Sequence, residues 1–271
     1  MAQENEEMSF LDHLGVLRSH LIRSGIAVFT LTILAFINKS ILFDDILLAS
    51  KEPDFVTYRA LCKVSEWLHL GDVLCITEQP FILMNVDMSG QFVMHLWVSF
   101  IAGIVIAFPY IIWELWHFIK PALLTKEVKY TSGVVFFVWF LFITGICFGY
   151  YMIAPLSVNF LGSYQVSEIV SNQINLSSFI STVTTITFAC GLIFQLPIVV
   201  YFLTSLGLLT PESMRQYRSH AIVGALVISA IITPPDLSSQ ILVALPLLAL
   251  YGISIRVSSI VLKKERKRNE A

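Results

Sequence analysis

Long runs without any charged residue constrain this chain more than any other feature. No Asp, Glu, Lys or Arg occurs between Asp87 and Glu114, between Lys129 and Glu168, or between Glu168 and Glu212. A helix needs about 20 apolar residues to cross a bilayer, because the hydrocarbon core is ~30 Å thick and a helix rises ~1.5 Å per residue. The chain is also 56% hydrophobic and only 13% charged. The sequence therefore predicts an integral membrane protein.

The apolar runs predict an all-α fold with six membrane-spanning helices, because a helix satisfies its own backbone hydrogen bonds in lipid. None of the runs shows the two-residue alternation of a barrel strand. We expect the spans at 21–39, 92–113, 132–154, 177–204, 219–233 and 238–257. The fifth has only about 15 residues, roughly 23 Å of helix, before the turn at Pro234 and Pro235. The last two spans are therefore expected to be short.

Proline and glycine positions refine this expectation. Pro109, Pro197 and Pro246 lie within apolar runs and are expected to kink or break them. Gly145 and Gly149 form a GxxxG pattern, which favours close packing against another helix.

Basic residues set the expected orientation. Six spans place both termini on one side, and all but four of the 17 Lys and Arg fall there. The positive-inside rule makes that side cytoplasmic. The four exceptions lie in or directly before the outer loop 40–91: Lys39, Lys51, Arg59 and Lys63. We expect short helices near 58–69 in this loop.

These patterns divide the chain into three parts. They are a cytoplasmic amphipathic helix at 1–20, a membrane domain at 21–257 that includes the outer loop, and a basic cytoplasmic tail at 258–271. Basic residues beside a span usually bind anionic lipid. We interpret the tail in this way and expect no nucleic-acid partner.

Cys62 and Cys75 both lie in the outer loop and form a candidate disulfide in an oxidising compartment. Two unpaired thiols are the alternative. The motifs HExxH, GxSxG and the Walker loop are absent, and the six histidines do not have metal-ligand spacing. We therefore expect no enzyme activity, no metal and no cofactor.

Two polar residues remain open at this point. Gln195 stands beside Pro197 in an apolar span, where it would bond carbonyls freed by the proline or a polar group on a partner helix. Glu127 follows an aromatic cytoplasmic stretch. It is either a solvated charge among lysines or, with the aromatic residues, a site for arginine.

Several motifs in order resemble the TatC family, the core receptor subunit of the twin-arginine protein translocase. The N-terminal segment with Leu17 and Arg18 resembles the family's HLxELRxRL. The segment from Phe118 through Pro121 to Leu123, followed by Glu127, resembles FIxPAL…E. Two further matches are the span-four motif Phe188–Pro197 and the hairpin Thr233–Asp236 with Gln240 and Pro246.

The resemblance implies a function. A TatC protein binds twin-arginine signal peptides of folded substrates and assembles with single-span partners of the TatA and TatB type and with other TatC copies. The proton-motive force drives export. The implied location is the bacterial cytoplasmic (inner) membrane, as a multi-pass protein.

The resemblance also implies a signal-binding surface at Glu127, Phe118 and Arg18. The family's N-terminal Glu is Val16 here. Our hypothesis is that Glu127 reads the arginine pair, with Asp12 or Glu114 partly replacing the lost carboxylate. We assign the candidate partner-helix contacts to Gln195, Gln240 and Asp236, and structural roles to Pro121, Pro197, Pro234 and Pro235.

Three rival interpretations remain. A small secondary transporter would need buried ionisable residues or internal repeats, and neither is visible. A membrane-embedded enzyme would need paired carboxylates or His clusters at bilayer depth. A degenerate Tat paralogue with weakened signal binding is favoured only by Val16.

Overall fold

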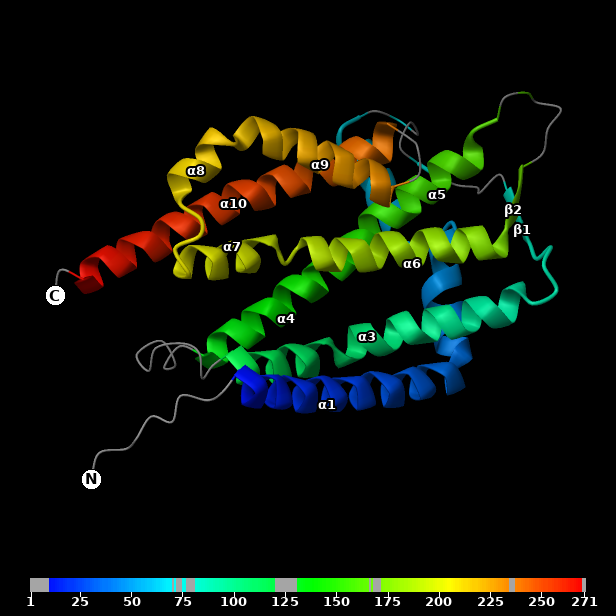
Figure 1. Ribbon diagram of the computed structural model, residues 1–271. Coiled ribbons are helices and arrows are strands. Elements are labelled where there is room, and N and C mark those ends of the chain that lie inside the picture. The colour runs from blue at the N-terminus through cyan, green and yellow to red at the C-terminus, as the bar shows by residue number, and fades with distance from the viewer. Residues whose placement is uncertain are drawn as a thin grey trace. The chain divides into compact units, whose positions relative to one another are not determined.

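The computed structural model describes residues 10–69, 71, 75–76, 81–119, 131–165, 167, 172–233 and 237–269. This part of the chain is nearly all helical (Figure 1). Five of its helical runs are long and apolar enough to cross a membrane: Gly15–Ile37, Gly90–Phe118, Gly133–Ser163, Leu176–Ser205 and Gln240–Lys263. The expectation of a polytopic α-helical membrane protein is confirmed.

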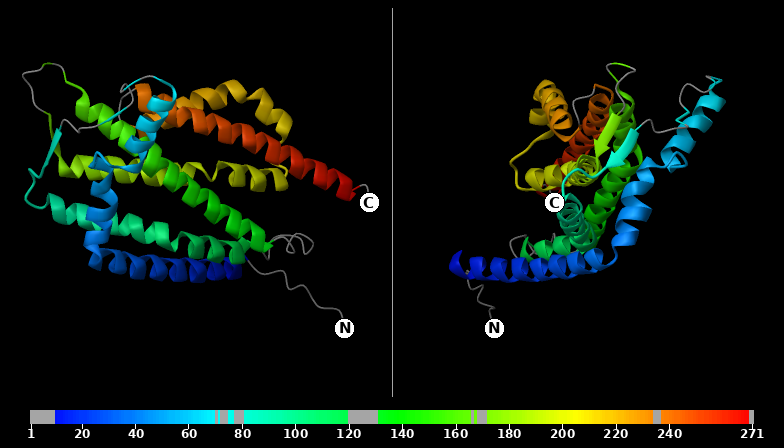
Figure 2. Two further views of the ribbon diagram at one scale, coloured as in Figure 1. Left: turned by 180° about the vertical axis from the view of Figure 1, so that it is seen from behind. Right: turned by 90° about the vertical axis from the view of Figure 1, so that its right-hand side faces the viewer.

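The chain folds as two compact units, Met1–Lys39 with Leu96–Phe140, and Ser40–His95 with Leu141–Ala271. In the first unit α1 (Phe10–Ile37) lies beside α3 (Gly90–Ile119), as Figures 1 and 2 show. A Cβ on Gly103 would lie 2.8 Å from the backbone nitrogen of Thr32, so only glycine permits this approach. The helix α1 is continuous across residue 20, so the expected surface helix and first span are one element.

The helix α3 is longer than expected. The second span is expected at 92–113, but the helix continues to Ile119. Neither proline nor glycine occurs between Glu114 and Ile119, so the sequence has no helix breaker directly after residue 113. Pro121 itself lies outside the described residues. As a result Glu114 is part of a helix.

The third span contains a π-helical turn. It comprises α4 (Thr131–Phe148), the π-helix η5 (Gly149–Ile153) and α5 (Ala154–Ser163). Pro155 has no N–H to donate to the carbonyl of Tyr151, four residues earlier. The hydroxyl of Thr57 donates to that carbonyl, and the hydroxyl of Tyr58 donates to the carbonyl of Pro155 at 3.1 Å. Both come from α2 (Val56–Trp67), the short helix expected near 58–69.

The GxxxG pattern packs as expected. Figures 1 and 2 show the run from α4 to α5 crossing α6 (Leu176–Ile193). A Cβ on Gly145 would lie 2.6 Å from the carbonyl oxygen of Cys190, and one on Gly149 would lie 2.9 Å from Cα of Thr187. Real Cβ atoms essentially never approach other atoms this closely. The two glycines therefore let the backbones of the two helices touch.

The fourth span is broken, as Pro197 predicts. The helix α6 gives way to a turn at Phe194 and Gln195, and α7 (Leu196–Ser205) follows. Pro197 lies in the first turn of α7, where its missing N–H has no intrahelical partner to lose. Pro109 and Pro246, by contrast, lie inside the helices α3 and α10 without ending them.

The last two helices differ in length. After α8 (Pro211–Gln216), α9 (Arg218–Ile232) has 15 residues and is short, as expected. The expectation is wrong for α10 (Leu237–Asn269), which has 33 residues and includes a 24-residue apolar span. One Arg256 does not end that helix, because Lys and Arg favour helices and extend their charges to the membrane surface. Pro234, Pro235 and Asp236 lie outside the described residues.

The outer loop holds more structure than expected. The π-helix η1 (Ile41–Leu47) and the 3-10 helix η2 (Leu48–Lys51) lead into α2. Two strands that the sequence did not predict, β1 (Phe81–Met84) and β2 (Asn172–Asn175), pair in parallel (Figure 2). The buried ring of Phe81 lies against Gly162, where any side chain would collide with it. This pairing joins the outer loop to the segment between the third and fourth spans.

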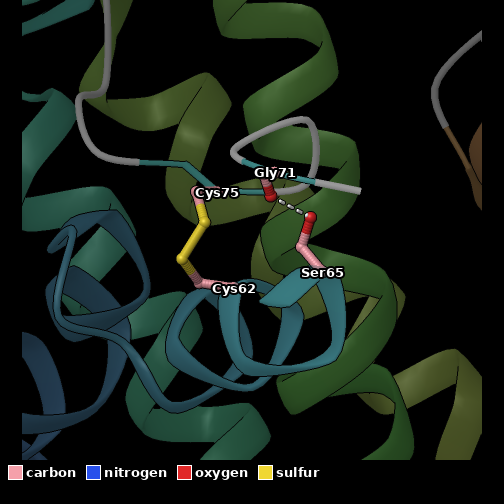
Figure 3. Close-up of a disulfide and its surroundings, with 4 residues drawn as sticks. All are labelled: Cys62, Ser65, Gly71 and Cys75. Carbon is pink, nitrogen blue, oxygen red and sulfur yellow. Dashed lines mark hydrogen bonds between the residues drawn. A yellow bond between two sulfur atoms is a disulfide. The ribbon is translucent and has the colours of Figure 1, made fainter. Parts of the chain in front are cut away.

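A disulfide closes the end of α2 (Figure 3). Cys62 on α2 is bonded to Cys75, with 4.4 Å between their Cα atoms. The hydroxyl of Ser65 donates to the carbonyl of Gly71 at 2.6 Å within the closed loop. The chain-entropy model gives a crosslink over a loop of this size about 3 kcal/mol of stabilisation.

The close contact at Gly145 makes a prediction. Gly145→Val should lower the free energy of unfolding by about 1–3 kcal/mol, because the new side chain must displace α6. Gly133→Val is the matched control on the same helix, since nothing lies within 4 Å of its Cβ position. Thermal unfolding in detergent measures both. Equal melting temperatures for the two variants would contradict the account.

Candidate functional site

One face of α3 and one residue of α1 build the candidate site. Tyr110, Glu114 and Phe118 recur at four-residue intervals and therefore share a helix face. His20 reaches them from α1. We call these four residues the His20–Glu114 cluster. All four belong to the first unit.

The carboxylate of Glu114 lies at the centre of this cluster and is only 3% exposed. The hydroxyl of Tyr110 donates to Oε1 of Glu114 at 2.7 Å. The ring Nδ1 of His20 contacts Oε2, and it donates when the carboxylate is ionised. A buried charge is expensive in an apolar span unless it is paired and hydrogen-bonded. Both oxygens of Glu114 meet that requirement.

The cluster extends to the end of α3 through Phe118. The ring of His20 meets the ring of Phe118 edge-on, with 6.4 Å between the centroids. His20 thus contacts Glu114 on one side and Phe118 on the other. The geometry braces α1 against α3 immediately before the segment that contains Glu127.

The two hydrogen bonds of Glu114 limit how it can bind an arginine. A carboxylate that accepts two hydrogen bonds from its own chain must release a partner before it can bind a guanidinium in the bidentate manner. In this structure Glu114 acts as the brace between two helices. Its predicted role as an arginine ligand stays a prediction.

The other predicted signal-binding residues fall in different places. Arg18 is exposed, and Val16 is 37% exposed, one helical turn before His20. Asp12 lies in the first turn of α1, and its side chain is outside the described part. Glu127 and Pro121 are outside the described residues. Of the five signal-binding candidates, the structure brings together Phe118 and Glu114, through His20.

The predicted partner-helix residues belong to the second unit. Gln195 is half-buried at the turn between α6 and α7. The side-chain amide of Gln240 donates to the carbonyl of Leu226 at 3.2 Å, which ties α10 to α9. Asp236 lies outside the described residues. Within the described ranges, no three His, Cys, Asp or Glu side chains come together as a metal site would need.

Sequence reasoning missed His20 and Tyr110. The spacing of Tyr110 and Glu114 was a usable signal, because residues four apart on a helix are neighbours. A lone carboxylate among aromatic residues also required a partner. The sequence did not indicate His20 as the partner of Glu114, because this contact depends on the register of α1 against α3.

The apolar helical runs define the class of this molecule, a polytopic helical membrane protein. The contact between His20 and Glu114 joins two of its helices. Residues 12–246 match the family described as "Sec-independent protein translocase protein (TatC)". This chain belongs to the TatC family.

Similar proteins cover nearly the whole chain. The Sec-independent protein translocase protein TatC of Blattabacterium sp. subsp. Periplaneta americana is 38% identical over 98% of this chain and 100% of its own length. TatCy of Bacillus subtilis is 32% identical over 98% of this chain and 94% of its own. A crystal structure of a "Twin Arginine Translocase Receptor", TatC, aligns with a TM-score of 0.70 at 30% identity. It covers 92% of this chain and 99% of that one.

The brace predicts a coupled effect on stability. His20→Ala should cost about 1–3 kcal/mol, because it removes a partner from a buried carboxylate. Adding Glu114→Gln to His20→Ala should recover part of that loss, because the unpaired charge disappears. Thermal unfolding of the two single variants and the double variant measures the coupling. Strictly additive effects would show that the pair does not act as a brace.

Proposed function

We propose that this protein recognises the twin-arginine signal peptides of folded substrates and carries them into a Tat translocase. Its place in the TatC family, which is a family of Sec-independent translocase proteins, supports this function. The solved structure that it resembles is described as a receptor. The observation that carries the proposal is the intact segment from Phe118 through Pro121 to Glu127 at the end of α3.

The proposed recognition rests on the chemistry of carboxylates and aromatic rings. A guanidinium binds a carboxylate through two parallel hydrogen bonds and stacks on aromatic faces. Glu114 already holds His20 and Tyr110. We therefore assign the arginine pair mainly to Glu127, with Phe118 beside it and Asp12 as the second acidic candidate. Glu114 contributes by holding α1 and α3 in place.

We further propose the setting in which this recognition occurs. Both chain ends face the cytoplasm of a bacterium, and the protein spans its inner membrane. Single-span subunits of the TatA and TatB type and further TatC copies complete the translocase, and the proton-motive force drives export. The charge asymmetry along the sequence supports the orientation.

Loss of the Glu127 charge tests the proposal. Glu127→Gln should reduce crosslinking to a twin-arginine peptide by roughly ten- to a hundredfold, because a charge-assisted bidentate contact is lost. Glu212→Gln, which removes an exposed carboxylate on α8, is the control. In a strain lacking this subunit, the wild-type chain should export a reporter with Arg-Arg but not one with Lys-Lys.

Two results would contradict this assignment. Unchanged crosslinking by the Glu127 variant would remove Glu127 from the signal site. A wild-type chain that is folded but exports neither reporter would favour a paralogue with weakened signal binding. In that case restoring the family carboxylate with Val16→Glu should raise export, since Val16 is exposed on the face that leads to His20.

Gln195 is our candidate for contact with a partner helix. It interrupts the fourth span, and polar side chains hold helices together in lipid. Gln195→Leu should reduce co-purification of a single-span Tat subunit several-fold. Gln216→Leu, at an exposed position on α8, is the matched control. Equal recovery of the partner with both variants would exclude this contact.

A further inference from the structure

A cavity of about 520 Å³ lies among α8, α9 and α10, in the second unit. Three arginines line it, one from each helix: Arg215, Arg218 and Arg256. The remaining lining residues are Ile222, Leu248, Tyr251, Gly252 and Ile255. The cavity is thus cationic and apolar, and it has no acidic lining residue.

The three guanidinium groups have no protein carboxylate to neutralise them in the described part of the chain. The two ion pairs found there join His20 with Glu114 and Arg59 with Asp54. Like charges around one cavity repel each other, and this repulsion is relieved when an anion enters. An arginine fork matches the oxygens of a phosphate group in the bidentate manner.

The lining changes from cationic to apolar along α9 and along α10. On α9, Arg218 is the first residue and Ile222 lies one turn further into the helix. On α10, Leu248, Tyr251 and Ile255 precede Arg256 on one face. A lipid has the same polarity, with an anionic head and an apolar tail. Arg256 also lies within the apolar span Gln240–Lys263.

A hydrogen bond holds the arginine of α8 at the cavity. The hydroxyl of Tyr251 donates to the carbonyl of Met214 at 2.7 Å, and Met214 is buried. This bond fixes α8 to α10 one residue before Arg215. At the same place Gly252 leaves room, because nothing lies within 4 Å of its Cβ position.

We propose that this cavity binds the phosphodiester head of an anionic phospholipid. Arg215, Arg218 and Arg256 bind the phosphate oxygens, and the acyl chain lies along Ile222, Leu248 and Ile255. Three uncompensated charges favour a lipid with net negative charge over a zwitterionic one. The assignment is independent of signal-peptide recognition, because the cavity shares no residue with the His20–Glu114 cluster.

Native mass spectrometry of the full-length protein tests the site. The protein is released from micelles containing equal phosphatidylglycerol and phosphatidylcholine, and the retained lipid is counted. We expect one phosphatidylglycerol to be retained preferentially. Arg218→Gln and Arg256→Gln should each reduce that adduct about tenfold, as loss of one charge-assisted contact implies. Lys263→Gln removes a charge from the same helix outside the cavity and should leave the adduct unchanged.

A second variant separates binding from folding. Gly252→Glu places a carboxylate in the cavity where there is space for it, so it should abolish the adduct while the melting temperature in phosphatidylcholine stays that of wild type. Equal retention of the two lipids would overturn the proposal, as would an equal loss with Lys263→Gln. If inorganic phosphate raised the melting temperature as much as phosphatidylglycerol does, the ligand would be a soluble anion and the lipid assignment would fail.

Discussion

Backbone carbonyls that lose their helical donor inside an apolar span must find another, and the architecture of the second unit depends on this constraint. Pro155 leaves the carbonyl of Tyr151 without its usual N–H. A π-helical turn forms at this place, and hydroxyl groups from α2 donate to the carbonyls of Tyr151 and Pro155. The outer loop is therefore part of the membrane domain's hydrogen bonding. Proline has little effect of this kind in the first turn of α7, where no donor is needed.

Polar side chains inside the spans also need hydrogen-bond partners. Glu114 is buried in α3 because Tyr110 and His20 satisfy both of its oxygens. Deeper in the second unit, the hydroxyl of Thr204 donates to that of Ser258 at 2.9 Å and joins α7 to α10. These two contacts therefore specify which helices pack together and in which register. The brace at Glu114 in turn holds the end of α3, which precedes the segment with Glu127 in the sequence.

The sequence predicted a polytopic α-helical membrane protein correctly, because apolar length and charge are local properties. It failed where a boundary or contact depends on distant residues. The helix α3 continues beyond the predicted span end at residue 113 and includes Glu114, whose partner His20 is remote in sequence. The strands β1 and β2 were missed because their pairing joins separate loops. The assignment of Glu127 to the signal site rests on the sequence, because Glu127 lies outside the described residues.

The order of these elements along the chain has a consequence for biogenesis. The helix α2 precedes the third span, so Thr57 and Tyr58 leave the ribosome before Pro155 does. The donors are made before the acceptors that need them. A third span that inserted without α2 would expose the carbonyl of Tyr151 to lipid. The third span therefore emerges when the hydroxyl groups that bond the carbonyls of Tyr151 and Pro155 are already part of the chain.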